Sequence, residues 1–307
     1  MTPAQLARLA MVLGALLLLW GAASLARRGS RGLSESDRFG VPVVAADSVD
    51  SVIVTRPADT TRLIRRDSAT WTVNGHPAST TAVQELFTAL ADTSRRTELV
   101  AARSGSHAGL GVDSAKGARI RITRGDSIVA DLVQGNRGPG LDGGYFRAAE
   151  DSAVYLVGGS LAEVLERSPD EWRDRRIAGT AADSVARVEI TRGKRSFAVR
   201  RDGAGWVLLP GGRADSAAVG ALLADYRRVE AAGFATNAQA DSANFARPER
   251  RATLLHADGT PLVTLAFDST ANGFWVRAGG DSIVYRIDTW FADRLTPADS
   301  ALKATTP

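Results

Sequence analysis

One phrase occurs twice in the chain, and this internal repeat limits the possible architectures more than any other feature. Residues 150–158 read EDSAVYLVG and residues 280–288 read GDSIVYRID. Aligning the two phrases brings other segments into register, such as DSVDSVIVTR at 47–56 with DSVARVEITR at 183–192. Self-similarity at a fixed spacing indicates a duplicated structural unit, so we expect one unit of about 125 residues, present twice in tandem.

Each copy carries the same order of strand and helix signals. The segments 47–56 and 183–192 alternate Val or Ile with polar residues, which is the period of a half-buried strand. A strand centred on a tryptophan follows in each copy, at Trp71 and Trp206. Next comes a helix with apolar residues at i, i+3, i+4 and i+7, preceded by an N-capping residue. The helix positions are Val83, Leu86, Phe87 and Leu90 after Ser79, and Val219, Leu222, Leu223 and Tyr226 after Asp215.

Two hairpins and a short helix complete each copy. The first hairpin turns at 124–126 in one copy and at 257–259 in the other, and the second returns through Tyr155 or Tyr285. Local connections of this kind favour antiparallel pairing. Short closing helices are expected around Leu161–Leu165 and Trp290–Leu295. We therefore predict an α+β fold, with an N-terminal transmembrane helix followed by two tandem α+β repeats with mainly antiparallel sheets.

The predicted transmembrane helix is an uncharged run of 18 residues from Leu9 to Ala26. A helix of that length just crosses a hydrocarbon core of about 30 Å. A cleaved signal peptide is the alternative, because 24–26 reads Ser-Leu-Ala, a small-x-small cleavage pattern. The run is longer than a signal core of about 7–15 residues, so we expect an uncleaved anchor.

These signals divide the chain into six predicted parts. The segment after the anchor is rich in Gly, Ser and Asp and has no helical period, which is typical of a linker. The parts are a short tail at 1–8, the anchor at 9–26, the linker at 27–46, the first repeat at 47–177, the second at 178–298 and a flexible tail at 299–307.

The charge balance argues against nucleic-acid binding. The formal net charge is +4, and residues 1–31 contain four arginines and no carboxylate, which leaves the remainder at zero. A neutral body with both signs interspersed is not a phosphate-tracking surface. The chain has no cysteine, which excludes disulfides, thiolate metal sites and cysteine nucleophiles.

No motif for catalysis, a cofactor or a metal stands out. His76, His107 and His256 are the only histidines, and no two have a metal-ligand spacing. Ser106 precedes His107, but no nucleophile elbow surrounds the pair. The stretch GNRGPGLDGG at 135–144 is similar to a phosphate-binding loop, yet it lacks the Lys-Ser/Thr ending and leads into a strand. We interpret it as a long hairpin loop and predict no catalytic, cofactor-binding or metal-binding residues.

Two polar stretches are the candidate interaction surface. The loop at 135–144 is one, because loops carry function more often than cores do. The other is SPDEWRDRRI at 168–177, which predicts a short helix with a serine N-cap, Pro at N1 and arginines towards its end. An Arg-rich docking surface is the functional interpretation of that stretch. The candidate residues are Asn136, Arg137, Asp142, Trp172, Arg173, Arg175 and Arg176.

Several of these segments together resemble the domain of unknown function 4340 family. They are the apolar N-terminus, the Trp71 strand leading to HPASTTAVQELFTAL, then AGLGV, GGYFRAAEDSAVYLV and EWRDRRI. The resemblance covers most of residues 47–300. The second copy departs from it, since NFARPER stands where the first has Gly109-Leu110-Gly111. Any role of that loop is then confined to the first copy.

The resemblance implies a bacterial protein with one N-terminal transmembrane helix, often found beside ABC-type transporters linked to gliding motility. We expect a non-enzymatic scaffold or accessory subunit of such a complex in the inner membrane, with integral-membrane transporter components as partners. A cell-envelope hydrolase and a ligand-binding sensor module are the alternatives. The arginines 27, 28 and 31 after the run favour a cytoplasmic domain, whereas a signal-like N-terminus favours export. We expect the extracytoplasmic side.

Overall fold

The computed structural model of the protein describes residues 41–304. The predicted anchor at 9–26, the N-terminal tail and most of the linker lie outside these residues. The described chain forms two compact units, one of residues 41–58 and 87–165 and the other of residues 59–86 and 166–304. The repeat boundaries at 47–177 and 178–298 stay a prediction.

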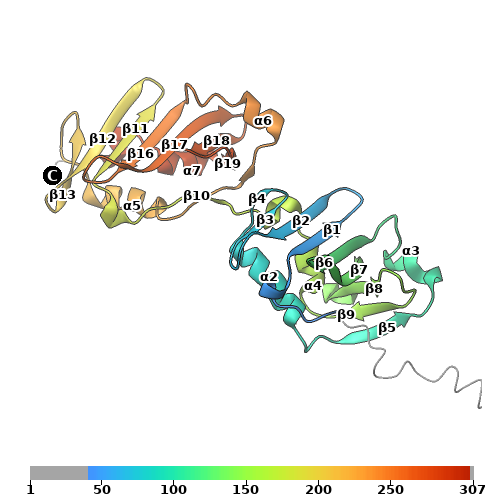
Figure 1. Cartoon of the computed structure of the whole chain (residues 1–307). Helices are drawn as coiled ribbons and strands as arrows, with labels where there is room; N and C mark the ends of the chain where they lie inside the picture. Colours follow the sequence, from blue (N-terminus) through green and yellow to red (C-terminus); the bar gives the residue numbers. More distant parts are fainter. Residues whose placement is uncertain (1–40, 305–307) are drawn as a thin grey trace, which may run out of the picture. The chain divides into compact units, whose positions relative to one another are not determined.

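The first sheet has nine strands in the order β4-β3-β2-β1-β6-β7-β8-β9-β5 (Figure 1). Strands β6, β7 and β8 follow one another in two antiparallel hairpins. Its strands are β1 Ser51–Thr55, β2 Thr60–Arg65, β3 Trp71–Val73, β4 His76–Pro77, β5 Thr97–Ala101, β6 Ala118–Arg124, β7 Ser127–Arg137, β8 Gly144–Ala148 and β9 Val154–Val157. The helices within residues 41–165 are η2 Ala46–Ser48, α2 Thr80–Ala91, η3 Ser104–Ser106, α3 His107–Leu110, η4 Pro139–Leu141 and α4 Leu161–Leu165.

The second sheet has eight strands in the order β13-β12-β11-β16-β17-β18-β19-β15. They are β11 Arg187–Arg192, β12 Arg195–Asp202, β13 Gly205–Leu209, β15 Gly233–Phe234, β16 Arg250–Leu255, β17 Pro261–Thr270, β18 Gly273–Ala278 and β19 Tyr285–Ile287. A small sheet pairs β10 Arg176–Ala178 with β14 Val229–Glu230. The helices are η5 Pro169–Trp172, η6 Ala182–Ser184, α5 Ser216–Asp225, α6 Asn237–Ser242, α7 Thr289–Leu295 and η7 Asp299–Leu302.

The two large sheets share one strand order. Without β4, the first reads β3-β2-β1-β6-β7-β8-β9-β5, and the second matches it strand for strand. In both, the first strand of the copy pairs with the first strand of the later hairpin, as β1 does with β6 and β11 with β16. The sequence repeat is thus accompanied by a repeated topology.

The predicted fold class is wrong for the described chain. Residues 41–304 form mostly antiparallel sheet, and their helices are few and short, so helix and strand are not balanced as in an α+β fold. None of the described helices combines the length and the apolar character that crossing a membrane requires. The predicted fold class is wrong because each copy packs one long helix and six or more strands around the same core, so that sheet is the dominant element.

The core of the second unit lies on one face of the sheet, against α5 and α7. Val188 and Ile190 alternate inward on β11, and their neighbours on β16 are also buried. Leu222 of α5 and Leu295 of α7 belong to the same cluster. Burying each such side chain contributes about 1.5–3 kcal/mol. The alternation therefore decides which face of β11 meets the helices.

The helix predictions are confirmed at their apolar faces and caps. All eight predicted apolar positions are buried, seven of them within α2 and α5 and the eighth, Tyr226, directly after α5. The Asp215 carboxylate accepts hydrogen bonds from the backbone N–H groups of Ala217 at 2.8 Å and Ala218 at 3.2 Å. Ser79 Oγ accepts one from the N–H of Ala82 at 3.3 Å. These bonds satisfy donors that the first turn of a helix leaves free.

The equivalent aromatic residues differ in burial. Tyr155 and Tyr285 are both buried, and Trp71 is 6% exposed. Trp206 is only partly buried at the border of the second core, where the Arg201 guanidinium lies 5.0 Å from its ring centroid. The two tryptophans keep the same pairing, each opposite an arginine of the preceding strand, but only one indole is fully inside.

The segment 168–177 differs from its prediction beyond the first turn. Ser168 is the expected N-cap, where it forms a capping box with Glu171, and Pro169 occupies the first turn, but η5 is a single 3₁₀ turn that ends at Trp172. The chain then becomes extended, because Arg176–Ala178 pairs with β14. The arginines therefore lie after the helix and do not complement its dipole from within its last turn.

Candidate functional site

The predicted hairpin loop at 135–144 is shorter in the structure, because residues 135–137 extend β7 and Gly144 begins β8; the remaining loop, 138–143, is tightly packed. A Cβ at Gly143 would lie 2.0 Å from the carbonyl oxygen of Val157, and Gly143 has a φ of +69°. A Cβ at Gly138 would lie 2.6 Å from the carbonyl oxygen of Asp142. The glycines thus allow close backbone contacts and a left-handed turn, which is a structural reason for their number.

The three candidate residues around this loop each have a partner inside the first unit. Asn136 Nδ2 donates to the carbonyl of Gly109 at 3.2 Å, which joins the end of β7 to α3. Arg137 Nη2 lies 4.0 Å from Glu163 Oε2 of α4. Asp142 Oδ1 accepts from the N–H of Gly159 at 3.4 Å. The side chains of Asn136 and Asp142 are nevertheless exposed.

The second candidate stretch is only partly a surface. Trp172 is fully buried, and the Arg167 guanidinium lies 5.4 Å from its ring centroid. Arg173 lies over the Phe234 ring at 3.5 Å and pairs with Asp170 at 3.2 Å. Of the four candidate residues in the stretch, only Arg175 and Arg176 are exposed. Trp172 and Arg173 therefore stabilise the fold, and the exposed arginines are what a partner could reach.

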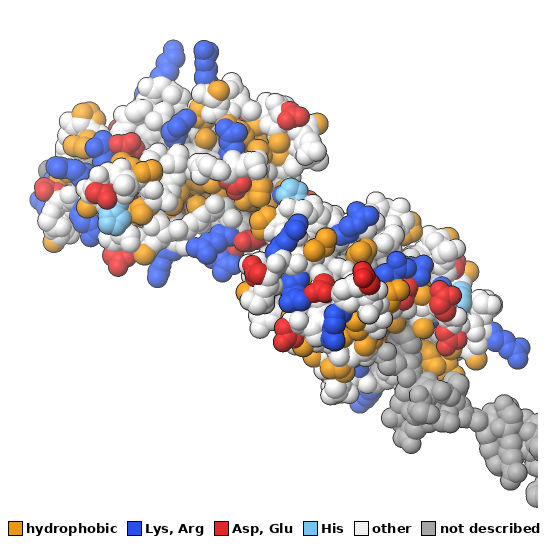
Figure 2. Space-filling view, in the orientation of Figure 1, with side chains coloured by type: hydrophobic (Ala, Val, Ile, Leu, Met, Phe, Trp, Pro, Cys, Tyr) orange, Lys and Arg blue, Asp and Glu red, His pale blue; other side chains and the backbone are white. Residues whose placement is uncertain are grey.

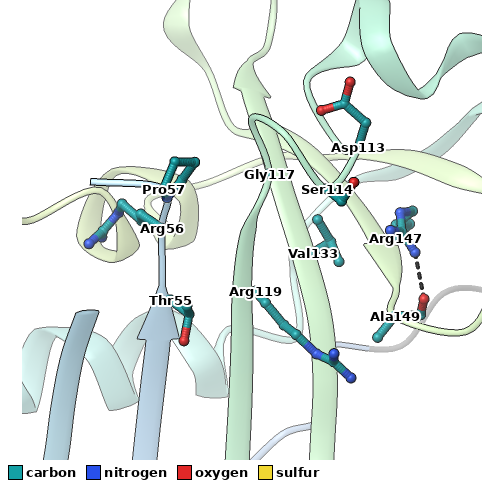
Figure 3. A pocket seen from close by; sticks show the side chains of 10 residues that line it. All are labelled: Thr55, Arg56, Pro57, Asp113, Ser114, Gly117, Arg119, Val133, Arg147 and Ala149. Atoms are coloured by element: carbon teal, nitrogen blue, oxygen red, sulfur yellow. Dashed lines mark hydrogen bonds between the residues drawn. The ribbon is translucent and has the colours of Figure 1, made fainter. Parts of the chain in front are cut away.

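A cavity of about 340 Å³ opens at one end of the first sheet (Figure 3). It brings together three guanidinium groups, two hydroxyls and a carboxylate on neighbouring strands and loops. Its lining residues are Thr55, Arg56, Pro57, Asp113, Ser114, Gly117, Arg119, Val133, Arg147 and Ala149. This composition is typical of an anion-binding cavity, so the question is whether its arginines are free to bind an anion.

Two of the three arginines donate hydrogen bonds to backbone carbonyls. Arg147 Nε donates to the carbonyl of Val112 at 2.9 Å, and its Nη1 donates to the carbonyls of Ala148 at 3.0 Å and Ala149 at 2.6 Å. Arg56 Nη2 donates to the carbonyl of Leu165, the last residue of α4. Such bonds satisfy carbonyls that helix ends and loops leave free.

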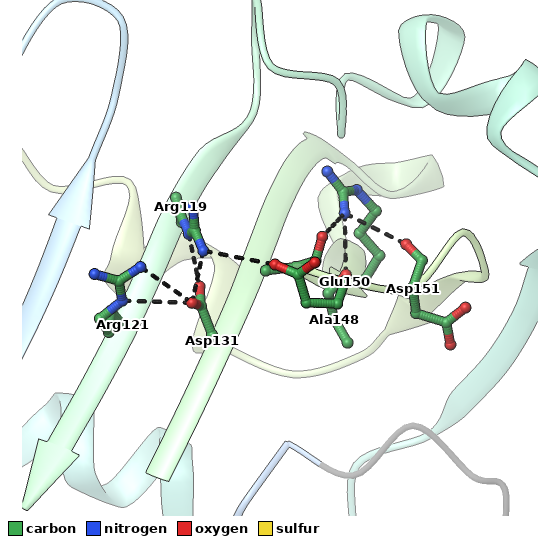
Figure 4. Close-up of polar contacts among 8 residues, drawn as sticks. Arg119, Arg121, Asp131, Ala148, Glu150 and Asp151 are labelled. Atoms are coloured by element: carbon green, nitrogen blue, oxygen red, sulfur yellow. Dashed lines mark hydrogen bonds and ion pairs between the residues drawn. The ribbon is translucent and has the colours of Figure 1, made fainter. Parts of the chain in front are cut away.

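The third arginine, Arg119, belongs to an ion-pair network across β6 and β7 (Figure 4). Its Nε and Nη2 bind Asp131 at 2.8 and 2.7 Å, a bidentate arrangement, and Arg121 Nη2 lies 3.3 Å from the same carboxylate. Glu150 Oε1 is 4.0 Å from Arg119. The hydrogen bond from Arg119 lowers the pKa of Asp131 despite its partial burial, and the same bond raises the pKa of Arg119.

Each guanidinium group of the first cavity therefore already has a hydrogen-bonding partner in the fold. These groups donate hydrogen bonds to backbone carbonyls and to the carboxylate of Asp131.

The described residues show no catalytic or metal-binding arrangement around His107 or His76. The Nε2 atom of His107 lies 2.8 Å from the carbonyl oxygen of Ser152. Burial lowers the pKa of His76 in the second unit, so that histidine is neutral near pH 7. In residues 41–304, no three His, Asp or Glu side chains gather where they could hold a metal ion.

Residues 71–248 match the family described as Domain of unknown function (DUF4340). The chain belongs to this family. No curated protein and no solved structure is significantly similar to the chain. The family segment contains α2, the loop from 138 to 143 and the start of the second sheet, including the turn between β11 and β12.

That turn lies at a second cavity, of about 630 Å³, within the second unit. The cavity has basic residues on the sheet side and apolar walls. Its lining residues are Arg192, Lys194, Arg195, Ser196, Phe197, Pro210, Ala298 and Asp299. The space-filling view shows basic and acidic side chains interspersed over the visible face of the molecule (Figure 2). A local excess of positive charge is therefore identified from the ion pairs that each basic side chain makes.

Our interpretation of the sequence missed this second cavity. Its local signal is TRGKR at 191–195, three cations in four residues at a hairpin turn. The matching turn of the first copy reads TRPAD at 55–59, where one arginine is balanced by one aspartate. Comparing the two copies residue by residue would have exposed the difference.

Proposed function

We propose that the chain is a non-enzymatic scaffold or accessory subunit of an ABC-type transporter complex in a bacterial inner membrane. In this proposal the uncharged run at 9–26 holds it at the membrane, and the folded part lies on the extracytoplasmic side. The run supports membrane attachment because hydrophobic transfer favours burying such a segment in lipid. Attachment confines encounters to the membrane plane, so a weak interface with a resident partner suffices.

The observation that carries the proposal is the exposed edge strand β5. It ends the first sheet beyond β9, and four of its five residues are exposed. Leu99 is 42% exposed and Val100 43%, although both are aliphatic. An edge strand with exposed aliphatic side chains is a template for another strand. Such edges serve as docking sites in many complexes.

The backbone of β5 indicates which groups a partner would meet. The N–H of Gly158 donates to the carbonyl of Arg96 at 2.9 Å, which directs the polar backbone groups of Arg96 towards the sheet. Because these groups alternate along an antiparallel strand, those of Thr97 and Leu99 point away from β9. The bulge between Leu99 and Ala101 ends the regular pairing there.

The proposed occupant is an extended segment of an integral-membrane component of the transporter, added as a further strand. The other sheet edges offer less: β4 and β15 have two residues each, and Val207 of β13 already bridges to Arg213. Among the described edge strands of the two large sheets, β5 is thus the one that is long enough to pair with a partner segment and has no strand on its outer side.

The test is co-purification of the full-length protein from mild detergent. Integral-membrane transporter components should accompany the wild-type protein. Leu99→Lys should reduce their recovery about fivefold, because a charge on the edge opposes strand addition. The matched control is Ile128→Lys, a 58% exposed residue of the inner strand β7, which should leave recovery unchanged.

Two results would reject the proposal. If no transporter component accompanies the wild-type protein even after cross-linking in cells, the functional assignment is wrong. If Leu99→Lys and Ile128→Lys behave alike while both proteins keep the wild-type unfolding profile, β5 is not the docking site.

A further inference from the structure

Three arginines lie side by side across the turn end of the second sheet. Arg192 of β11 pairs in register with Arg195 of β12 on one side and with Arg250 of β16 on the other. Directly opposed like charges destabilise a sheet. All three lie on the face that carries Val188, Ile190 and the helices, because residues two apart on a strand share a face.

Only part of this positive charge is neutralised by the fold. Asp293 of α7 lies 3.1 Å from Arg192 and 2.7 Å from Arg250, whose side chain is 9% exposed. Arg250 is also 3.9 Å from Glu249. Lys194 and Arg195 make no ion pair within the described part of the chain. Two exposed cations therefore stand beside an arginine whose carboxylate is already shared.

These cations line the cavity of about 630 Å³, together with Phe197, Pro210 and Ala298. A cavity of that size is within the range of small-molecule sites, which are about 300–1,000 Å³. Asp299 is the one carboxylate among its lining residues. The cavity thus combines a basic rim with an apolar wall, an arrangement that fits an anionic group attached to a less polar body.

We propose that this cavity binds the phosphate group of a phosphorylated ligand, with Arg195 and Lys194 as its principal contacts. Arg195 presents a planar fork that matches phosphate oxygens, and Lys194 adds a flexible point charge. A bound phosphate also relieves the repulsion between Arg195 and Arg192. The apolar wall takes the body of the ligand, which is either the glycerol and acyl part of a lipid or the organic part of a soluble phosphate ester.

The proposal concerns a site independent of β5, and it is tested on the full-length protein in detergent. Titration calorimetry at low ionic strength measures binding of inorganic phosphate and of monomeric short-chain phosphatidic acid. Arg195→Gln should weaken both affinities about tenfold, the loss expected when one charge-assisted hydrogen bond is removed.

The matched control is Arg200→Gln, which removes the same charge from the other face of the same strand. Arg200 is exposed and lies opposite Arg187 and Val207 in the sheet. The affinities of the Arg200→Gln variant for phosphate and for phosphatidic acid should stay within about twofold of those of the wild-type protein. Thermal unfolding of both variants checks that each is folded.

The calorimetry distinguishes a lipid ligand from a soluble phosphate ester, and it can also show that the cavity binds no phosphate. Tighter binding of phosphatidic acid than of phosphate assigns a lipid headgroup, and equal binding assigns a soluble phosphate ester. No binding of either probe by the wild-type protein, or equal losses in Arg195→Gln and Arg200→Gln, would show that the cavity is not a phosphate site.

Discussion

Arg56 and Arg192 occupy the same place in the two sheets, yet they meet different partners. Each follows a threonine, with Arg56 directly after β1 and Arg192 as the last residue of β11, and each reaches the closing helix of its unit. Arg56 donates to the carbonyl of Leu165 in α4, whereas Arg192 pairs with the carboxylate of Asp293 in α7. The repeated topology thus preserves the arginine, and the chemistry around it has diverged.

The difference continues in the residues that follow. The first turn goes on with Pro57, Ala58 and Asp59, and the second with Gly193, Lys194 and Arg195. Around the first cavity each guanidinium has an internal acceptor, while around the second two cations have none among the described residues. The two copies thus differ in that the cations of the first cavity have acceptors within the fold, whereas Lys194 and Arg195 of the second make no ion pair among the described residues.

The largest difference between the two sheets should appear at the tryptophans. Trp71→Ala should lower the free energy of unfolding by about 3–5 kcal/mol, because a buried indole is lost and a cavity remains. Trp206→Ala should cost about half as much, since its indole is only partly buried. Urea unfolding of both variants measures the contrast. If the two substitutions lower the free energy of unfolding equally, the different exposure of Trp71 and Trp206 does not distinguish the two copies.

The next contrast is between equivalent carboxylates of the closing helices. Asp293 and Glu163 each lie two residues before the last leucine of their helix. Asp293→Asn should cost about 2 kcal/mol, because the nearly buried Arg250 loses its closest carboxylate. Glu163→Gln should change stability by less than about 0.5 kcal/mol, because its pair with Arg137 is long and exposed. Chemical denaturation of the two variants tests this ranking, and a larger cost for Glu163→Gln would reverse it.

A smaller effect with a defined pH dependence is expected in the first sheet. Asp131→Asn should cost about 1 kcal/mol at pH 7, because Arg119 and Arg121 lose the carboxylate that they share. The pKa of Asp131 is lowered in the folded protein. The pair therefore stabilises fully above the ordinary aspartate pKa of about 3.9 and loses its effect as the pH falls through the lower folded value.

The pH dependence is checked by unfolding both proteins between pH 7 and pH 3. The difference between wild type and Asp131→Asn should stay constant down to about pH 5 and shrink below the ordinary aspartate pKa. A difference that grows as the pH falls would contradict the assigned direction of the pKa shift.

The elements that the sequence predicts well are those encoded by local pattern. The faces of α2 and α5 follow from apolar spacing, and Asp215 follows from the chemistry of helix starts. The predicted fold class failed because the short strands outweigh the helices once the hairpins assemble. Trp172 was placed on the surface because its neighbours are charged, although it is fully buried.

The second cavity is a non-local feature, and this is why it escaped prediction. The row of arginines depends on the register between β11 and β16, whose residues 192 and 250 are far apart in the sequence. Whole-chain charge also hides it, because the body of the chain balances to zero. The sequence shows the cations of the turn itself, whereas their alignment with Arg250 and the partial neutralisation by Asp293 are visible only in the structure.

The central claim is that the second copy keeps positive charge that its own fold leaves unbalanced, and Arg195→Glu tests it most directly. Replacing Arg195 by a carboxylate opposite Arg192 converts a repulsive cross-strand pair into an attractive one. The account predicts that this variant is more stable than wild type by about 0.5–1 kcal/mol at low ionic strength, with the gain shrinking in about 1 M salt. Unfolding free energies at the two salt concentrations provide the measurement. A variant that is equally or less stable than wild type at low salt would contradict the claim.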